Sequence, residues 1–179
     1  MFSYAKRILR YLKGTIDRCL TYRKSGKLNL VGYVDADFAG DVTDLKSRTG
    51  FFFMLGNNVV SWSSTKQSIV TLSTSEAEYV ALSATAQEGL WLQRLLCDIN
   101  IKVKNFTLYE DNKNTISYCN NNDNNRRTKH IDVRYRFIND QVQDGNISIV
   151  YVESNSQIAD ILTKPLGKTL FCKHRNMLC

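Results

Sequence analysis

The strongest hydrophobic pattern in the chain runs from Leu72 to Leu96, where small and apolar residues recur at helical spacing. That spacing predicts one long helix with a single buried stripe. Its start fits a capping box in two registers, either Ser73 with Glu76 or Ser75 with Glu78. A capping box uses only one glutamate, so the other glutamate is free for a different role.

Five shorter segments are rich in β-branched and aromatic residues and predict strands. Gly56-Asn57-Asn58 separates the second segment from the third, which predicts an antiparallel hairpin. The expected strands are 28–35, 50–55, 59–64, 106–110 and 147–152, and the further expected helices are 4–12, 113–119, 133–143, 156–162 and 168–179. From residue 28 the order is β-β-β-α-β-α-α-β-α. It predicts an α/β fold, in which helices pack on a mixed sheet of three antiparallel strands and two strands that follow helices.

We expect residues 1–27 to form a separate appendage that leads into the main domain. It contains a short basic helix, a stop at Gly14, a candidate strand over 20–23 and a turn over 24–27. We therefore expect the main domain to cover residues 28–179. Within it, the run 120–125 is too polar to pack and predicts a mobile loop.

Composition limits the class of protein without identifying it. The 179 residues are 43% hydrophobic and 11% aromatic, as in a globular domain with a real core. No apolar run approaches the roughly 20 residues of a membrane-spanning helix, and the N-terminus lacks the apolar core of a signal peptide. The five cysteines are scattered and include no CxxC pair, which favours free thiols in a reducing compartment. We expect an intracellular protein with no membrane partner.

The net charge of +7 and the pI near 9.2 suit a polyanionic partner such as nucleic acid. Many basic proteins bind no polyanion, so the charge alone is weak evidence. Only two or three basic side chains should matter for gripping phosphates. The candidates are Lys66, Arg126, Arg127, Lys129, Arg134 and Arg136.

Four acidic residues occupy positions at which this element order exposes side chains. Asp35 ends the first predicted strand, Asp111 ends the fourth, Glu78 lies in the first turn of the long helix, and Asp160 begins a late helix. If the first and fourth strands are neighbours, these carboxylates converge at one edge of the domain. Clustered carboxylates repel one another unless a cation lies between them, and magnesium or manganese prefers such oxygens. Two ions about 4 Å apart can activate a water and stabilise the leaving oxygen of a phosphodiester.

Each aspartate has a plainer interpretation when it is taken singly. An aspartate at a strand end is more often a turn former or a helix cap than a metal ligand. Asp37 also competes with Asp35, because the period of two places both on the same face of the strand. The combination of four acids in this element order favours a metal site.

Seven segments carry recognisable motifs: 5–15 (AKRILRYLKGT), 32–41 (GYVDADFAGD), 61–67 (SWSSTKQ), 75–79 (SEAEY), 110–112 (EDN), 127–135 (RTKHIDVRY) and 157–166 (QIADILTKPL). Taken together and in order, these motifs resemble the ribonuclease H domain of copia-type LTR-retrotransposon Pol polyproteins, with a short tail of the reverse-transcriptase connection. The resemblance covers nearly the whole chain and is highly specific.

The resemblance implies a ribonuclease H-like five-stranded sheet with helices on both faces. It also implies hydrolysis of the RNA strand of RNA–DNA hybrids by two Mg²⁺ ions, with Mn²⁺ as the alternative. The ligand set carries over to Asp35, Glu78, Asp111 and Asp160, which leaves Glu76 for the helix cap. His130 belongs to the Lys-His-Ile motif and is expected to face the substrate or support the structure. The implied partners are the hybrid and the reverse-transcriptase part of the same polyprotein. The implied location is the cytoplasm, virus-like particles or the nucleus.

Other functions of related sequences fit less well. A retroviral-type integrase needs a glutamate about 35 residues after its second aspartate; that position is near Asn146, and the nearest glutamate is Glu153. A polymerase box would need a second aspartate where Ala36 stands. The abrupt start at Met1, inside the connection region, suggests a truncated copy. It therefore keeps open a catalytically inactive remnant that only binds nucleic acid.

Overall fold

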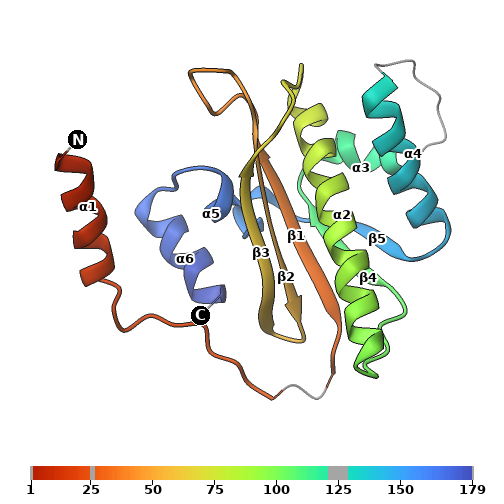
Figure 1. Ribbon diagram of the computed structural model, residues 1–179, viewed down its shortest axis with the longest axis horizontal. Coiled ribbons are helices and arrows are strands. Elements are labelled where there is room, and N and C mark those ends of the chain that lie inside the picture. Colours follow the sequence, from red (N-terminus) through yellow and green to blue (C-terminus); the bar gives the residue numbers. More distant parts are fainter. Residues whose placement is uncertain (1, 25–26, 121–128, 179) are drawn as a thin grey trace.

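Three antiparallel strands form the part of the sheet that begins the main domain. The computed structural model describes residues 2–24, 27–120 and 129–178 (Figure 1). Strand β1 (Leu30–Asp37) pairs with β2 (Arg48–Leu55), and β2 pairs with β3 (Asn58–Lys66). Strand β2 is buried on both faces, because Phe51 and Phe53 belong to one hydrophobic cluster and Phe52 to the other. A strand covered on both faces needs a continuous apolar run, and this sequence supplies it.

Two parallel strands complete the sheet on the other side of β1. Strand β4 (Phe106–Glu110) lies beside β1, and β5 (Ile147–Tyr151) lies beside β4, so the sheet order is β3-β2-β1-β4-β5. Connections between parallel strands must cross over a face of the sheet, and helices make those crossings here. The predicted mixed five-stranded sheet is confirmed.

Helices cover both faces of the sheet, also as predicted (Figure 1). On one face lie α2 (Thr74–Asp98), α3 (Lys113–Asn120) and α4 (Lys129–Gln143), where α2 packs against β1 and β2. On the other face lie a 3-10 turn η1 (Ser154–Ser156), α5 (Asp160–Thr163) and α6 (Lys168–Leu178). Within the described ranges, no helix combines the length and the apolar character needed to cross a membrane.

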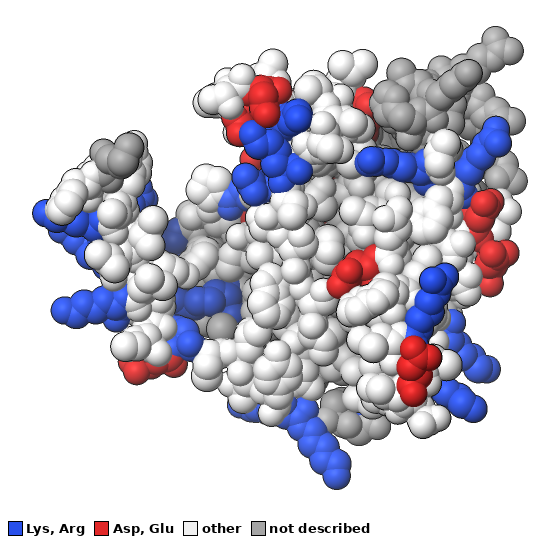
Figure 2. Space-filling view, in the orientation of Figure 1, with Lys and Arg blue, Asp and Glu red and all other residues white. Residues whose placement is uncertain are grey.

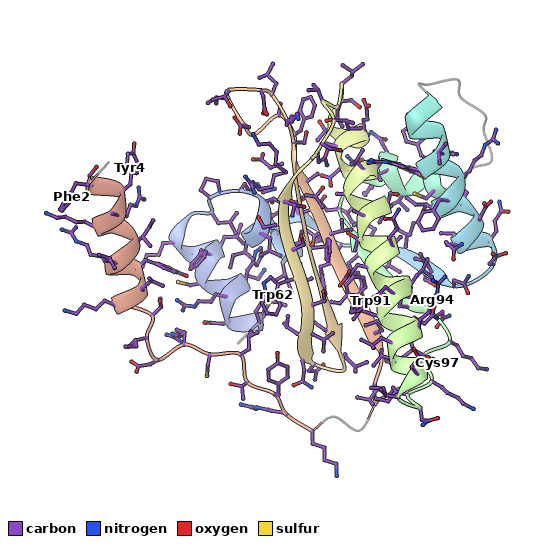
Figure 3. The ribbon with its side chains drawn as sticks, in the orientation of Figure 1. Phe2, Tyr4, Trp62, Trp91, Arg94 and Cys97 are labelled. Atoms are coloured by element: carbon purple, nitrogen blue, oxygen red, sulfur yellow. The ribbon has the colours of Figure 1, made fainter. Side chains whose placement is uncertain are left out.

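The N-terminal segment differs in part from the prediction. Helix α1 (Phe2–Lys13) forms and has no buried residue, and Phe2 and Tyr4 project from it into solvent (Figure 3). The strand expected over 20–23 is wrong. The side chain of Asn58 accepts a hydrogen bond from the Arg23 backbone N–H and donates one to the Arg23 carbonyl. A side chain thus takes the place of a neighbouring strand, while Leu20 packs on the cluster around Phe52. The boundary at residue 27 stays a prediction.

The C-terminal segment differs more. The helix expected over 156–162 is wrong, because only η1 and the four-residue α5 form there. Between them, the Gln157 side chain donates hydrogen bonds to the carbonyls of Val34 and Tyr109, and Ile158 and Ala159 are buried. These contacts hold the chain against the sheet, which the sequence pattern could not indicate. The polar run expected as a loop lies outside the described residues from residue 121 onward.

Gly89 tests whether packing or helix propensity controls the middle of α2. A Cβ at this position would lie 2.4 Å from Cε2 of Phe106 and 2.9 Å from Cζ of Phe53. Alanine gains about 1 kcal/mol in helix propensity, but overpacking a rigid aromatic core costs typically about 1–3 kcal/mol. We expect Gly89→Ala to lower the free energy of unfolding measured in urea.

Gly167→Ala is the matched control, because a Cβ there would meet nothing within 4 Å. Its effect should stay within about 0.5 kcal/mol. A Gly89→Ala variant at least as stable as the wild type would contradict the expectation, because the rings of Phe53 and Phe106 would then yield enough for the gain in helix propensity to offset the overpacking.

A candidate carboxylate metal site

The parallel pairing of β1 and β4 places two aspartates at the same level. Tyr33 pairs with Tyr109 in the register of these strands. Asp35 and Asp111 each follow their tyrosine by two residues, so both lie at the carboxyl edge of the sheet. Asp35 does not end its strand, contrary to the prediction, because β1 continues to Asp37 through pairing with β2. Asp111 follows the last residue of β4 directly.

The start of α2 supplies the third carboxylate. The Ser73 side chain accepts a hydrogen bond from the Glu76 backbone N–H, and the Glu76 carboxylate accepts one from the Leu72 N–H at 2.7 Å. The first of the two capping registers is therefore correct. Glu76 serves the cap, while Glu78 is buried and points toward the sheet edge, beside Asp35 and Asp111.

Asp35, Glu78 and Asp111 form a compact carboxylate trio. One oxygen from each lies within 4.8 Å of the others, a spacing that fits ligation of one metal ion. The trio faces a pocket of about 640 Å³. Asp37 lines the same pocket but is not part of the trio, so the geometry favours Asp35 over Asp37.

Asp160 is the first residue of α5 and lies near Asp35, outside the trio. Its carboxylate is buried and forms an ion pair with Lys164 at 2.9 Å, and Lys164 also lies 3.6 Å from Asp35. The Thr163 hydroxyl donates a hydrogen bond to the same oxygen of Asp35. The structure therefore brings the fourth predicted acid next to the trio, with a lysine between it and Asp35.

Sequence reasoning missed Glu110, which is 0% exposed beneath the trio. One of its oxygens accepts a hydrogen bond from the Asn112 N–H at 3.0 Å, and the other has no hydrogen-bond partner. The signal was present in the alternation of β4, where Phe106, Leu108 and Glu110 all point inward. Read as a period-two strand, that segment predicts a buried carboxyl group.

Burial and mutual repulsion shift these carboxyl groups toward their neutral forms. Burial raises the pKa of Asp35 to about 6, although Lys164 and Thr163 act in the opposite direction. Burial and the neighbouring Glu110 raise the pKa of Glu78 well above its ordinary range. Burial likewise raises the pKa of Glu110, helped by Asp111. Each shift is what a cluster of like charges in a low-dielectric site requires.

The basic residues expected to bind nucleic acid are less well defined. The ammonium group of Lys66 forms ion pairs with Asp41 at 2.6 Å and Asp44 at 3.0 Å. Arg134 and Arg136 lie on α4, half-buried and exposed respectively. Figure 2 shows the face of the molecule that is turned toward the viewer in Figure 1. Its lysines and arginines are spread mostly around the rim, with acidic side chains among them. The other candidates have side chains outside the described part of the chain: Arg126, Arg127, Lys129 and His130.

Comparison with known proteins identifies relatives by sequence. No family model matches the chain. It is 42% identical, over 94% of its length, to the "Retrovirus-related Pol polyprotein from transposon TNT 1-94" of Nicotiana tabacum. It is also 42% identical, over 93% of its length, to the polyprotein from transposon RE1 of Arabidopsis thaliana. The chain spans only 13% and 11% of these two relatives.

Comparison with solved structures identifies the fold. LC11-RNase H1 superimposes with a TM-score of 0.56 at 16% identity, covering 75% of this chain and 92% of that one. An N-terminal RNase H domain from Mycobacterium tuberculosis gives 0.57 at 14% identity, covering 84% and 98%. A foamy viral protease-reverse transcriptase, solved with an RNA/DNA hybrid, gives 0.54 at 15% identity, covering 82% and 21%.

The sequence relatives and the fold agree with the order of strands and acids along this chain. The chain is homologous over nearly its whole length to a segment of retrovirus-related Pol polyproteins from copia-type transposons, and its fold is that of ribonuclease H domains.

Proposed function

We propose that the chain is a ribonuclease H that hydrolyses the RNA strand of RNA–DNA hybrids with divalent metal ions. It would act as part of a Pol polyprotein that also carries a reverse transcriptase, inside the cell, in the cytoplasm, in virus-like particles or in the nucleus. The observation that carries the proposal is the carboxylate trio of Asp35, Glu78 and Asp111 at the carboxyl edge of a ribonuclease H fold.

The residues present fit a hard divalent cation. The trio offers only oxygen donors, and Glu78 keeps a buried oxygen with no hydrogen-bond partner. Magnesium and manganese take carboxylate oxygens while keeping several waters, and the open pocket leaves room for those waters. Asp35, Glu78 and Asp111 would hold the first ion, and Asp160 with Asp35 would contribute to a second. When bound, such ions activate a water and stabilise the leaving oxygen of the phosphodiester.

The remaining residues of the site orient these acids. Thr163 fixes one oxygen of Asp35 through its hydroxyl, and the Asn112 N–H fixes Glu110 below the trio. Tyr33 stacks between Phe52 and Tyr109, with ring centroids 5.0 and 4.8 Å away, on the two strands beside β1. A rigid set of oxygens keeps the ligand geometry without reorganisation when a substrate arrives.

Substrate choice should depend on the shape of the duplex. An RNA–DNA hybrid presents 2′-hydroxyls in a wide minor groove, and these distinguish RNA from DNA without reading the bases. Basic residues on α4, Arg134 among them, are candidates for contacts to phosphates. Cleavage should therefore depend little on the base sequence.

Substitution of the trio tests the proposal on a labelled RNA–DNA hybrid. Asp111→Asn keeps the size of the side chain but removes a charged ligand, so metal-dependent cutting of the RNA strand should fall by at least about 100-fold, the typical effect of removing one stabiliser of a transition state. Asp37→Asn is the matched control, because it lines the same pocket outside the trio. It should stay within several-fold of the wild type.

A wild-type chain that binds the hybrid but does not cut it, with magnesium or with manganese, would contradict the proposal. That outcome would instead establish the alternative, an inactive remnant that only binds nucleic acid.

The pKa of Asp35 near 6 predicts how cleavage depends on pH. Ligation requires the carboxylate form, so protons and metal ions compete for Asp35 below about pH 6. We expect cleavage at limiting magnesium to fall as pH decreases from 8 to 5, and saturating magnesium to move the midpoint to lower pH. A midpoint that does not move with magnesium concentration would assign the titration to another group.

Glu110→Gln should stabilise the metal-free protein at neutral pH. Because the folded state raises the pKa of Glu110 above 4.5, wild-type stability is highest when this group is neutral and falls as pH rises from about 4.5 toward the raised pKa. Glutamine is neutral at every pH, so in EDTA at pH 7.5 the melting temperature should rise by a few degrees, on the order of 1 kcal/mol. At pH 4 the difference should vanish.

The exposed Glu153 supplies the control for this measurement, because its side chain makes no capping hydrogen bond. Glu153→Gln should change the melting temperature little at either pH. A Glu110→Gln variant that is less stable at pH 7.5 would mean that the hydrogen bond from Asn112 outweighs the repulsion.

A further inference from the structure

Lys164 is the cation closest to the carboxylates among the described residues that line the pocket. Its ammonium group lies 2.9 Å from Asp160 and 3.6 Å from Asp35, both of which are buried. The other lysine that lines this pocket, Lys113, instead places its ammonium group over the ring of Tyr151, 4.6 Å from the ring centroid. Only one of the two lysines is therefore directed at the acids.

The backbone fixes Lys164 in this position. Its N–H donates to the Asp160 carbonyl at the end of α5, and its φ and ψ of −137° and 154° are extended. The next residue is Pro165, which disfavours helical geometry in the residue before it. Helix α5 thus ends at Thr163, and Lys164 leaves it with its side chain beside the two acids.

The ordinary pKa of a lysine lies far above 7, and Lys164 is held beside two carboxylates. Its side chain therefore carries a positive charge at neutral pH. Its side chain is 38% exposed, so it can swing toward the solvent without breaking the core.

The geometry points to Lys164 as a built-in counter-cation, which occupies the Asp35–Asp160 side of the site in the metal-free protein and which a second divalent ion must displace. This inference rests on the proposed use of divalent ions at the site. It concerns loading of the site, whereas the proposed function concerns cleavage.

The site contains two groups of acids, the trio and Asp160 with Asp35, and these two groups should differ in how strongly they bind a cation. The trio of Asp35, Glu78 and Asp111 can take one ion without involving Asp160. A second ion on Asp160 would lie within a few ångströms of the Lys164 ammonium group, where two positive charges repel strongly. The first ion should therefore bind with Lys164 in place, while the second should bind only as Lys164 moves away.

Lys164 and the second ion compete for Asp160, so binding of the second ion should depend on whether a substrate is present. A phosphodiester that enters the pocket offers Lys164 another anion, which lets the ammonium group leave Asp160. Asp160 would then be free of its ion pair with Lys164 and available to hold a second ion. Full loading would accordingly accompany substrate binding, and the metal-free site would remain charge-compensated.

Binding of Mn²⁺ to the 179-residue chain without nucleic acid tests the inference, with free Mn²⁺ measured by electron paramagnetic resonance. The wild type should bind one ion well and a second weakly. Lys164→Gln should tighten the second ion by about tenfold or more, because one repelling charge is removed. Lys164→Arg should keep the second ion weak, and Lys113→Gln, which makes the same charge change in the same pocket, should behave as the wild type.

A second variant keeps the test informative if Lys164→Gln does not fold. Asp160→Asn should lose the second ion and retain the first. Thermal melting in EDTA gives an independent readout: Lys164→Gln should melt lower than Lys113→Gln, and excess Mn²⁺ should close that gap.

Two outcomes would overturn the inference. One is a Mn²⁺ isotherm for Lys164→Gln identical to that of the wild type. The other is weaker hybrid binding by Lys164→Gln with unchanged Mn²⁺ binding, which would make Lys164 a phosphate contact. A chain that shows the expected metal binding but never cuts a hybrid would refute the proposed function and leave this inference standing.

Discussion

The pairing of β1 with β4 is the constraint on which the rest of the site depends. Because the two strands are parallel and Tyr33 is level with Tyr109, their aspartates reach the same edge from segments about 75 residues apart in sequence. A shift of one residue in this register would turn one aspartate to the other face of the sheet. Stacking of Tyr33 with Tyr109, at 4.8 Å, adds a side-chain contact to the backbone ladder.

The same edge concentrates charge that the fold itself does not need. Asp35, Glu78, Glu110 and Asp160 are all nearly inaccessible to solvent, and among the described residues Lys164 is the cation that forms ion pairs with them. Isolated buried carboxylates destabilise a folded protein. The domain can hold them because a large aromatic core under α2 stabilises the sheet independently of the site. The candidate site therefore lies at the carboxyl edge of the sheet, while the apolar core that stabilises the fold lies between the sheet and α2.

The sequence predicted most of the fold because its signals were local. The apolar run of β2, the Gly-Asn turn before β3 and the capping box of α2 each specify an element without reference to distant residues. Where tertiary contacts decide, prediction failed: Gln157 ties its segment to Val34 and Tyr109, so no long helix forms there. The four candidate acids could be named from motif order. The burial of Glu110 was indicated only by the alternation of β4, and Lys164 could be recognised only once its neighbours were known.

The position of Gln157 in the sequence also affects the order in which parts of the structure form during synthesis. Its side chain joins the carbonyls of β1 and β4 from a segment that lies near the end of the chain, and Asp160 and Thr163 follow it directly. During synthesis strands β1 to β4 and α2 leave the ribosome well before these residues. The nascent chain can therefore form its core early, while the carboxylate site assembles only after residues 157–164 have emerged. The contacts that Gln157, Asp160 and Thr163 make at the carboxylate site are thus the last of the site to form.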